Sequence, residues 1–229
     1  MSSTRPFKIA GSILGGDPLN LQQAIGACER AGVDLHQLDV CDGVFVPTIS
    51  FGEEVVRRTC EVASVPVEVH LMVARPEDWL RRMEGMGQFR MIFHLEASQR
   101  SMGLVQSIHR LKWEAGIALN PETPPGAVEP FLDVVENVCV MGIAPGFAGQ
   151  TMLDYTYRKV ADIRGLIDDA GAATTVTVDG GVKQSNARRL VEAGADILVV
   201  SSGIFAHPRP EQSVAGIRNA VSASSTPVT

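Results

Sequence analysis

The chain has 229 residues, of which 45% are hydrophobic and 20% are charged, and its formal net charge is −6. This composition is typical of a globular protein with a sizeable apolar core, and the length is near that of a single α/β barrel. An acidic chain offers no basic face to nucleic acid or to an anionic membrane surface, so we expect neither as a partner. No apolar run approaches the roughly 18 residues that a membrane span needs, and we expect no signal peptide from the polar residues 1–5.

The cysteines do not form a recognisable framework. Cys28, Cys41, Cys60 and Cys139 show no paired short spacing, which argues against a zinc ribbon and against a set of disulfides. Together with the composition, this pattern predicts a reduced, cytoplasmic protein.

Short β-branched segments alternate with amphipathic segments along the chain, which is the pattern of parallel strands joined by crossover helices. We expect eight strands, centred near Ile9, Leu38, Val69, Ile92, Ala118, Val140, Val176 and Leu198. Helices are expected between them at residues 21–31, 75–86, 101–114 and 186–193. Gly32 and Gly194 supply the left-handed turns that end two of these helices.

No shift in composition and no long linker divides the chain, so residues 1–229 are expected to form one domain. Its core should span about residues 6–220, with disordered tails at residues 1–5 and 221–229. An open doubly wound sheet also fits the alternation. Polar residues at the carboxyl end of nearly every strand favour instead an α/β fold with a single (β/α)₈ TIM barrel.

The polar side chains at these strand ends are where a barrel enzyme carries its active site. Strand alternation places Gln37 and Asp39 on one face of the second strand, and His70 and Met72 on one face of the third. Asp179 ends the seventh strand, almost opposite Asp39 in a ring of eight. Two opposed carboxylates can remove a proton from one face of a carbon and return it on the other, as an epimerisation requires.

The same residues suit a divalent metal. The carbanion of such a reaction must be held as an enediolate, and a metal does this by polarising the carbonyl oxygen. His70 with Asp39 and Asp179 offers a suitable mixture of nitrogen and oxygen ligands. Each residue alone is more commonly a cap, turn or structural residue, and it is the arrangement of the three that favours catalysis.

Three glycine-rich segments follow the sixth, seventh and eighth strands, at residues 144–150, 179–182 and 201–205. Glycines let backbone N–H groups converge on an anion, and barrels often bind phosphate in the loops after strands seven and eight. One such segment is commonly only a tight turn, but three in succession favour a phosphate site. These segments contain no Lys or Arg, so the backbone and Ser202 are expected to hold the phosphate.

Seven segments are long and unusual enough to compare with known families: residues 12–14, 39–47, 69–73, 93–97, 118–124, 145–150 and 178–181. Together, and in this order, they resemble the ribulose-phosphate 3-epimerase family, and the resemblance runs from about residue 8 to about residue 206. It implies a (β/α)₈ barrel of the ribulose-phosphate-binding type that interconverts D-ribulose 5-phosphate and D-xylulose 5-phosphate. It also implies a divalent metal ion, for which manganese, magnesium, zinc, iron(II) and cobalt are the candidates.

The resemblance implies roles for individual residues. Asp39 and Asp179 would be the two acid/base groups and also metal ligands, with His70 as a further ligand. The substrate contacts that it implies are Ser12, His70, Met72, Met141, Gly146, Gly149, Gly180, Gly181, Ser202 and Gly203. The last six of these would surround the phosphate.

One departure from the family pattern affects the metal site. The family has His-x-Asp before its first aspartate, with the histidine as a metal ligand, and here Gln37 takes that position. His36 is one residue too early, so an undisturbed strand points it toward the helices, and only a bulge would bring it inward. Gln37 offers an amide oxygen as the ligand, which we expect to weaken transition-metal binding and to favour manganese or magnesium.

Smaller departures surround the site. Cys41 stands where the family has Met and adds an oxidisable or metal-binding thiol. Gly11 replaces a proline, Ser201 replaces a glycine, and Glu68 replaces an aspartate. Glu68 is a candidate hydrogen-bond partner for the metal ligands.

Three functions stay open at this point. The first is an active pentulose-phosphate 3-epimerase. The second is a 3-epimerase of another ketose phosphate, either allulose 6-phosphate, to whose branch residues 120–124 and 145–150 are similar, or a tetrulose phosphate. The third is a sugar-phosphate binder with a degraded metal site, although a binder has no need of two opposed carboxylates. A homo-oligomer is also expected, because barrels often pair through loops or helices.

Overall fold

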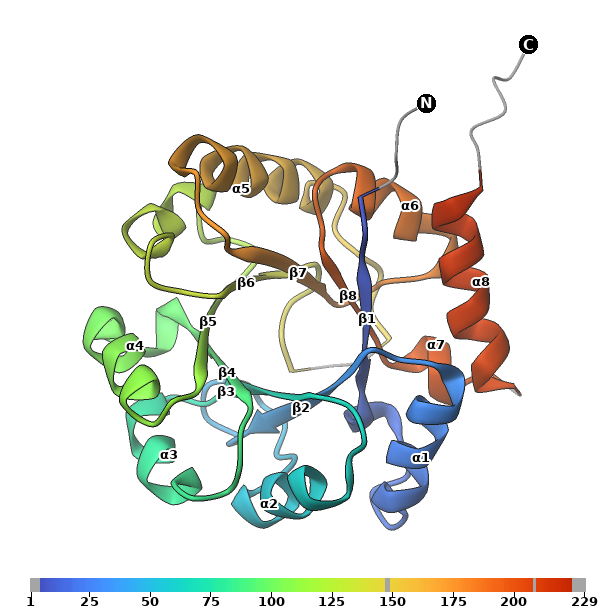
Figure 1. Ribbon diagram of the computed structural model, residues 1–229, viewed down its shortest axis with the longest axis horizontal. Helices are drawn as coiled ribbons and strands as arrows, with labels where there is room; N and C mark the ends of the chain where they lie inside the picture. The colour runs from blue at the N-terminus through green and yellow to red at the C-terminus, as the bar shows by residue number, and fades with distance from the viewer. Residues whose placement is uncertain (1–4, 147–148, 208, 224–229) are drawn as a thin grey trace.

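The computed structural model describes residues 5–146, 149–207 and 209–223. In this part of the chain the strands follow one another in sequence order around a closed parallel barrel, with helices on its outside (Figure 1). The strands are β1 (Lys8–Ser12), β2 (Leu35–Cys41), β3 (Val67–Met72), β4 (Arg90–His94), β5 (Glu114–Leu119), β6 (Asn137–Met141), β7 (Thr175–Asp179) and β8 (Ile197–Val200). Every expected strand centre lies within one of them. Because β1 pairs with β8, the sheet is closed and the TIM barrel is confirmed over the open sheet.

The helices cover the outer face of the barrel. They are α1 (Leu21–Ala31), α2 (Glu53–Val62), α3 (Pro76–Met83), α4 (Ser101–Arg110), α5 (Thr156–Ala170), α6 (Gln184–Glu192), α7 (Ser202–Phe205) and α8 (Pro210–Ser222). Three short 3₁₀ helices complete the described part: η1 (Ile13–Gly15), η2 (Leu95–Ala97) and η3 (Pro125–Phe131). Among the described residues, no helix is both long enough and apolar enough to cross a membrane.

Two of the expected helices are too long and one begins too late. The helix expected at residues 101–114 ends at Arg110, because Lys112 has a positive φ of 61° and Glu114 already opens β5. The helix expected at residues 75–86 ends at Met83, shortly before Gly85, which has a φ of 81°. The helix expected at residues 186–193 begins at Gln184, where the Asn186 side chain accepts a hydrogen bond from the Lys183 N–H.

The expected start of the C-terminal tail is wrong by at least two residues. Val221 and Ser222 belong to α8, and Val221 is 1% exposed. Its burial against the core holds the helix in place beyond residue 220. The rest of the tail expectation, for residues 1–4 and 224–229, lies outside the described residues.

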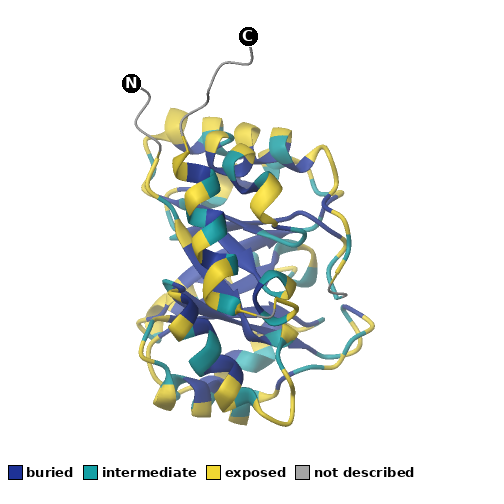
Figure 2. Cartoon of the chain, turned by 90° about the vertical axis from the view of Figure 1, so that its right-hand side faces the viewer, coloured by how far each residue is buried: buried dark blue, intermediate teal, exposed yellow. Residues whose placement is uncertain are grey.

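The strands are buried on both faces, and the exposed residues gather on the outer faces of the helices (Figure 2). Alternate strand residues such as Leu38 and Val69 pack outward in the large core beneath the helices. The others fill the barrel interior, where Ile92, Ala118, Cys139 and Met141 form one apolar cluster. Cys28, Cys41, Cys60 and Cys139 are free cysteines.

The strand register brings the polar strand ends to one level. Asp39 is the partner of His70 between β2 and β3, and Met141 is the partner of Asp179 between β6 and β7. Ser12, the last residue of β1, is the partner of Gln37. The carboxyl end of the barrel is thereby lined with the side chains that carry the candidate site.

Candidate active site

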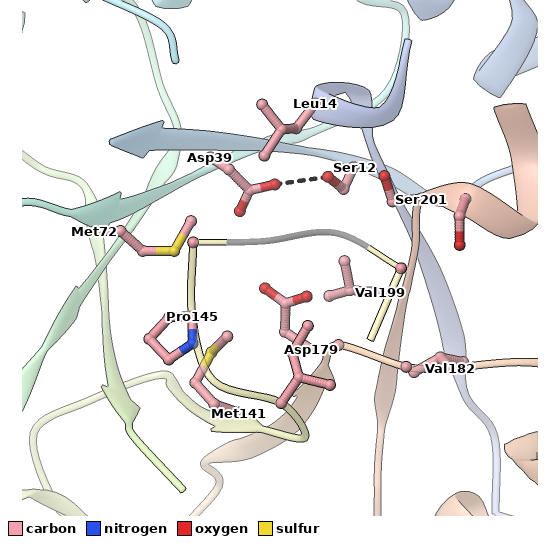
Figure 3. A pocket seen from close by; sticks show the side chains of 16 residues that line it. Ser12, Leu14, Asp39, Met72, Met141, Pro145, Asp179, Val182, Val199 and Ser201 are labelled. Atoms are coloured by element: carbon pink, nitrogen blue, oxygen red, sulfur yellow. Dashed lines mark hydrogen bonds between the residues drawn. The ribbon is translucent and has the colours of Figure 1, made fainter. Parts of the chain in front are cut away.

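A pocket of about 620 Å³, partly open to solvent, lies at the carboxyl ends of the strands. Ten of the residues singled out in the sequence line it: Ser12, Asp39, Met72, Met141, Gly146, Gly149, Asp179, Gly180, Gly181 and Ser202. Figure 3 shows Asp39 and Asp179 reaching into the same space from β2 and β7. Gln37 and His70 are fully buried and do not line the pocket, and neither does Gly203. Leu14, Ile143, Pro145, Val182, Val199 and Ser201 also line it. Pro145, Val182 and Ser201 belong to the glycine-rich segments expected at the phosphate, whereas sequence reasoning gave no site role to Leu14, Ile143 or Val199.

The two carboxylates are joined by shared hydrogen-bond partners. Gln37 Nε2 donates to Asp39 Oδ1 and to Asp179 Oδ2, both at 2.8 Å. His70 Nδ1 lies 3.1 Å from the same Asp39 oxygen and 3.3 Å from the same Asp179 oxygen. These four atoms therefore form a closed ring at the bottom of the pocket.

The orientation of the Gln37 amide follows from these contacts. Its N–H groups face the two carboxylates, whereas its oxygen, Oε1, is buried and has no hydrogen-bond partner. A neutral amide donor thus occupies the place where the family pattern has a ligating imidazole.

Asp39 is held as a carboxylate by its neighbours. The Ser12 hydroxyl donates to Asp39 Oδ2 at 2.6 Å, as Figure 3 shows. Burial raises the pKa of Asp39, but the hydrogen bonds from His70, Ser12 and Gln37 and the charge of His70 outweigh it, and the net direction is downward. These contacts therefore favour the ionised form of Asp39.

His70 carries the complementary charge. Burial alone lowers its pKa, but the hydrogen bonds and charges of Asp179 and Asp39 overcome this and raise the pKa to about 10. On its other side, His70 Nε2 lies 2.9 Å from His94 Nε2, and the two rings stack with centroids 5.0 Å apart. The imidazole is thus held between the carboxylates and His94.

His94 and Glu96 extend this buried network away from the pocket, and sequence reasoning did not assign either of them to the site. His94 Nδ1 lies 3.5 Å from Glu96 Oε2, and Glu96 also accepts hydrogen bonds from the Asn120 N–H and the Thr123 hydroxyl. Burial by itself would raise the pKa of Glu96, but the hydrogen bonds outweigh this effect and lower the pKa to about 2. The available signal was strand alternation, because His94 lies two residues beyond Ile92, the register partner of His70, and therefore faces the same interior.

Cys139 is a second residue that sequence reasoning did not place in the site. Its sulfur, one nitrogen of His70 and one carboxylate oxygen of Asp179 all lie within 4.8 Å of one another, which makes them a group able to hold a metal ion. The signal was again strand alternation, because Cys139 lies two residues before Met141 and faces the same interior.

His36 and Cys41 lie where their strand geometry directs them. His36 is fully buried on the outer face of β2, with Nε2 3.2 Å from Glu29 Oε1 of α1, which confirms that it faces the helices. Cys41 faces the mouth of the barrel and packs with Val46 and Met72. Neither side chain joins the ring around the carboxylates.

The loop after β7 shows why its glycines are required. Gly180 and Gly181 have φ values of 100° and 72°. A Cβ at Gly181 would lie 2.7 Å from the backbone nitrogen of Met152, so a larger residue would separate the loops after β6 and β7. Ser201, which follows β8, and Ser202, the first residue of α7, also line the pocket. Residues 147 and 148 of the expected phosphate segment lie outside the described residues.

Comparisons of the whole barrel with solved structures agree on the fold. Orotidine 5′-phosphate decarboxylase from Pyrococcus horikoshii aligns with a TM-score of 0.67 at 16% identity, covering 94% of this chain and 100% of that one. A 3-hexulose-6-phosphate synthase aligns with a TM-score of 0.67 at 15% identity, with the same coverage. At these identities the comparison establishes the barrel and nothing about the reaction.

Comparisons of the sequence are more specific. Residues 8–205 match the model of the ribulose-phosphate 3 epimerase family. The ribulose-phosphate 3-epimerase of Methanocaldococcus jannaschii is 36% identical over 214 residues, which are 93% of this chain and 91% of that protein. The chloroplastic ribulose-5-phosphate-3-epimerase of Arabidopsis thaliana is 35% identical over 213 residues, 92% of this chain and 75% of that protein. The chain therefore belongs to the ribulose-phosphate 3-epimerase family, whose members are isomerases.

Proposed function

We propose that this protein interconverts D-ribulose 5-phosphate and D-xylulose 5-phosphate by moving a proton at C3 between two carboxylates, with a divalent metal bound beside them. The observation that carries the proposal is the convergence of Asp39 and Asp179 on one pocket from β2 and β7. A sugar carbon held between them would present one face to each carboxylate. The names of the relatives support a ribulose phosphate as the substrate.

The two aspartates would exchange roles between the forward and reverse directions. At the start of a turnover one must be ionised and the other protonated, because one removes the C3 proton and the other supplies its replacement on the opposite face. Asp39 is held ionised by its hydrogen bonds. It would therefore be the base in whichever direction of the reaction begins with Asp39 ionised. Ser12 would keep the Asp39 carboxylate aimed at the pocket through its 2.6 Å hydrogen bond.

The residues around the carboxylates fit a divalent cation. His70 Nδ1 lies 3.1 Å from the Asp39 oxygen and 3.3 Å from the Asp179 oxygen of the ring. Atoms that share a small cation lie about this far apart, given metal–ligand distances of roughly 2.0–2.2 Å. Gln37 Oε1 is buried without a partner, so an oxygen ligand is available on that amide. When bound, the cation would polarise the substrate carbonyl and stabilise the enediolate.

The rest of the pocket supports a phosphorylated sugar. The glycine loops after β6 and β7 and the hydroxyls of Ser201 and Ser202 line one side, and they can hold phosphate oxygens without a cationic side chain. Met72 and Met141 line the side near the carboxylates and would shield the carbanion from water.

Turnover by metal-stripped protein tests the proposal. The protein is dialysed against a chelator, and D-ribulose 5-phosphate is then offered with manganese, magnesium, zinc, iron(II) or cobalt added back. We expect formation of D-xylulose 5-phosphate to return with at least one metal. The absence of turnover with every metal contradicts the proposed substrate.

Two further assays separate the alternatives if D-ribulose 5-phosphate is not converted. Turnover of allulose 6-phosphate or of a tetrulose phosphate would reassign the substrate within the same chemistry. Binding of these sugar phosphates with no exchange of the C3 proton into deuterated water would identify a binder that does not catalyse.

The proposal extends to the setting of the protein. We propose that it works in the cytoplasm on a small sugar phosphate as a homo-oligomer, without nucleic acid or membrane as a partner. The four free cysteines suit a reducing compartment, and the net charge of −6 is unfavourable for binding polyanions.

A further inference from the structure

Cys139 lies inside the barrel, one layer below the aspartate of β7. Met141 is the register partner of Asp179, and Cys139, two residues earlier, is the partner of Thr177. The side chain is fully buried beside Ile92 and Ala118. The thiol therefore approaches the ring around the carboxylates from its closed side, opposite the pocket opening.

The distances suit a shared cation. The sulfur of Cys139 and the donor atoms of His70 and Asp179 lie within 4.8 Å of one another. A sulfur and a nitrogen on one tetrahedral zinc ion are roughly 3.6 Å apart, given bonds of about 2.3 and 2.1 Å. The side chains would have to move closer together on binding to close this difference.

The Gln37 amide supplies the second observation. It turns its N–H groups to both carboxylates and leaves Oε1 buried and unpartnered. A cation placed between Asp39 and Asp179 gains two carboxylate oxygens and the His70 nitrogen, but a neutral amide is a weak fourth ligand for a transition metal. The sulfur of Cys139 is a stronger donor for such a metal, and it lies close to the donor atoms of His70 and Asp179.

We propose that Cys139 is a ligand of the cation held by Asp39, His70 and Asp179, and that this chain consequently prefers zinc, cobalt(II) or iron(II) to manganese or magnesium. As the cation binds, the sulfur and the His70 nitrogen each donate a lone pair to it, and the thiol proton and the imidazolium proton pass to solvent, with no change of oxidation state. The ligand set would be Asp, Asp, His and Cys. This preference is the reverse of the one expected from Gln37 alone, because a thiolate is a soft ligand.

This inference rests on the proposed function, because it requires that the site binds a metal. The competing explanation is that Cys139 is only a residue of the core. Free cysteines are often small apolar residues of a core, and Cys139 lies in an apolar cluster. In that case the thiol would never contact a metal, and replacing it would change stability without changing the spectrum of the bound ion.

Cobalt(II) substitution of the full-length, metal-stripped protein separates the two explanations. A thiolate bound to cobalt(II) gives an intense near-ultraviolet charge-transfer band that oxygen and nitrogen ligands do not give. We expect the band in the unaltered protein and its loss in Cys139→Ala and Cys139→Val, the second of which matches the neighbouring Val138 and Val140. Cys41→Ala, which removes another buried thiol at the same end of the barrel, should keep the band.

Binding constants give a second readout. Zinc affinity should fall on the order of 10- to 100-fold or more in both Cys139 variants. Losing a residue that only hydrogen-bonds to a metal ligand already costs about this much, and a direct ligand should cost at least as much. Manganese affinity should change little, because a thiolate contributes little to binding that ion. Circular dichroism would verify that each variant is folded.

The proposal is overturned if the unaltered protein binds cobalt(II) without the band, or if the band persists in folded Cys139 variants. If neither variant folds, a protein carrying Cys28→Ala, Cys41→Ala and Cys60→Ala decides the matter, since Cys139 is then its sole thiol. Retention of the band there assigns it to Cys139, and its loss excludes Cys139. If added metal restores epimerisation but the band is absent, only the assignment of Cys139 as a ligand is rejected. If the band is present but epimerisation is not, only the proposed reaction is rejected.

Discussion

Asp179 offers the most direct test of the two carboxylates at the scale of single residues. We predict that Asp179→Asn lowers epimerisation on the order of 100-fold or more, because an amide cannot take or supply the C3 proton. Exchange of the C3 proton with deuterated water should persist for only one of the two epimers, the one whose proton faces Asp39. Nuclear magnetic resonance measures both rates.

Binding of inorganic phosphate provides the control for this variant. It should be unchanged in Asp179→Asn, since the proposed phosphate loops keep their backbone. Normal turnover by the variant would show that Asp179 is not one of the two proton-transfer groups.

Gln37 is expected to limit the strength of metal binding. We predict that Gln37→His raises the metal content that survives dialysis against a chelator, because an imidazole nitrogen is a stronger transition-metal ligand than an amide oxygen. His36→Gln is a matched control, since His36 points away from the site toward Glu29. Equal metal content in the unaltered and Gln37→His proteins would contradict this role for Gln37.

Glu68 should make stability depend on pH. Its Oε1 has no hydrogen-bond partner, and burial raises its pKa from 4.5 to about 7 against the opposing charges of Arg90 and His70. Between these values the folded protein keeps a proton that the unfolded chain has lost, so the free energy of unfolding falls as pH rises through this window.

Glu68→Gln is expected to remove this dependence and to stabilise the protein at pH 8 by about 1–3 kcal/mol. Arg90 keeps its 2.7 Å ion pair with Glu114 in the variant, so no charge is left unpaired. Urea unfolding at pH 5 and pH 8 measures the effect. Parallel pH dependences in the two proteins would refute it.

The end of α8 provides a prediction at the scale of elements. Ending the chain after Ala220 removes Val221, which is 1% exposed, and should lower the free energy of unfolding by roughly 1.5–3 kcal/mol. Ending it after Ala223 leaves α8 complete and serves as the control. Equal melting temperatures for the two truncated proteins would show that the last turn of α8 contributes nothing to stability.

The end of α4 illustrates where local patterns fail for an element. The amphipathic pattern continues through Leu111 and Trp113, so it predicts a helix that reaches Glu114. In the structure the Trp113 indole donates to the Gly87 carbonyl at 2.9 Å and packs against Phe89 with ring centroids 4.3 Å apart. These partners are more than 20 residues away in the chain, so no local window contains the reason for the end of the helix.

At the scale of the whole molecule, self-association is the prediction that remains to be measured. Val44 and Ile49 lie in the loop after β2 and are 76% and 80% exposed, which is costly for large apolar side chains in a lone subunit. We expect sedimentation equilibrium to give a multiple of the 24.5 kDa subunit mass. Ile49→Asp should weaken the assembly, whereas Met102→Asp on α4 should not, and a 24.5 kDa species at every concentration would contradict the prediction.

The sequence alone determined the positions of the eight strands, the barrel and the placement of Asp39, His70 and Asp179 near the carboxyl ends of their strands. These features follow from alternation within a strand and from the rule that parallel strands end at one edge, both of which are local or topological. The same alternation correctly placed His36 against the helices.

Only the tertiary structure decided which side chains of neighbouring strands meet. The contact of His70 with His94, the approach of Cys139 from below and the direction of the Gln37 amide all depend on the closure and register of the barrel. A sequence pattern states which face of its strand a residue occupies, but distances between strands and the orientation of an amide are set by packing and hydrogen bonding in three dimensions.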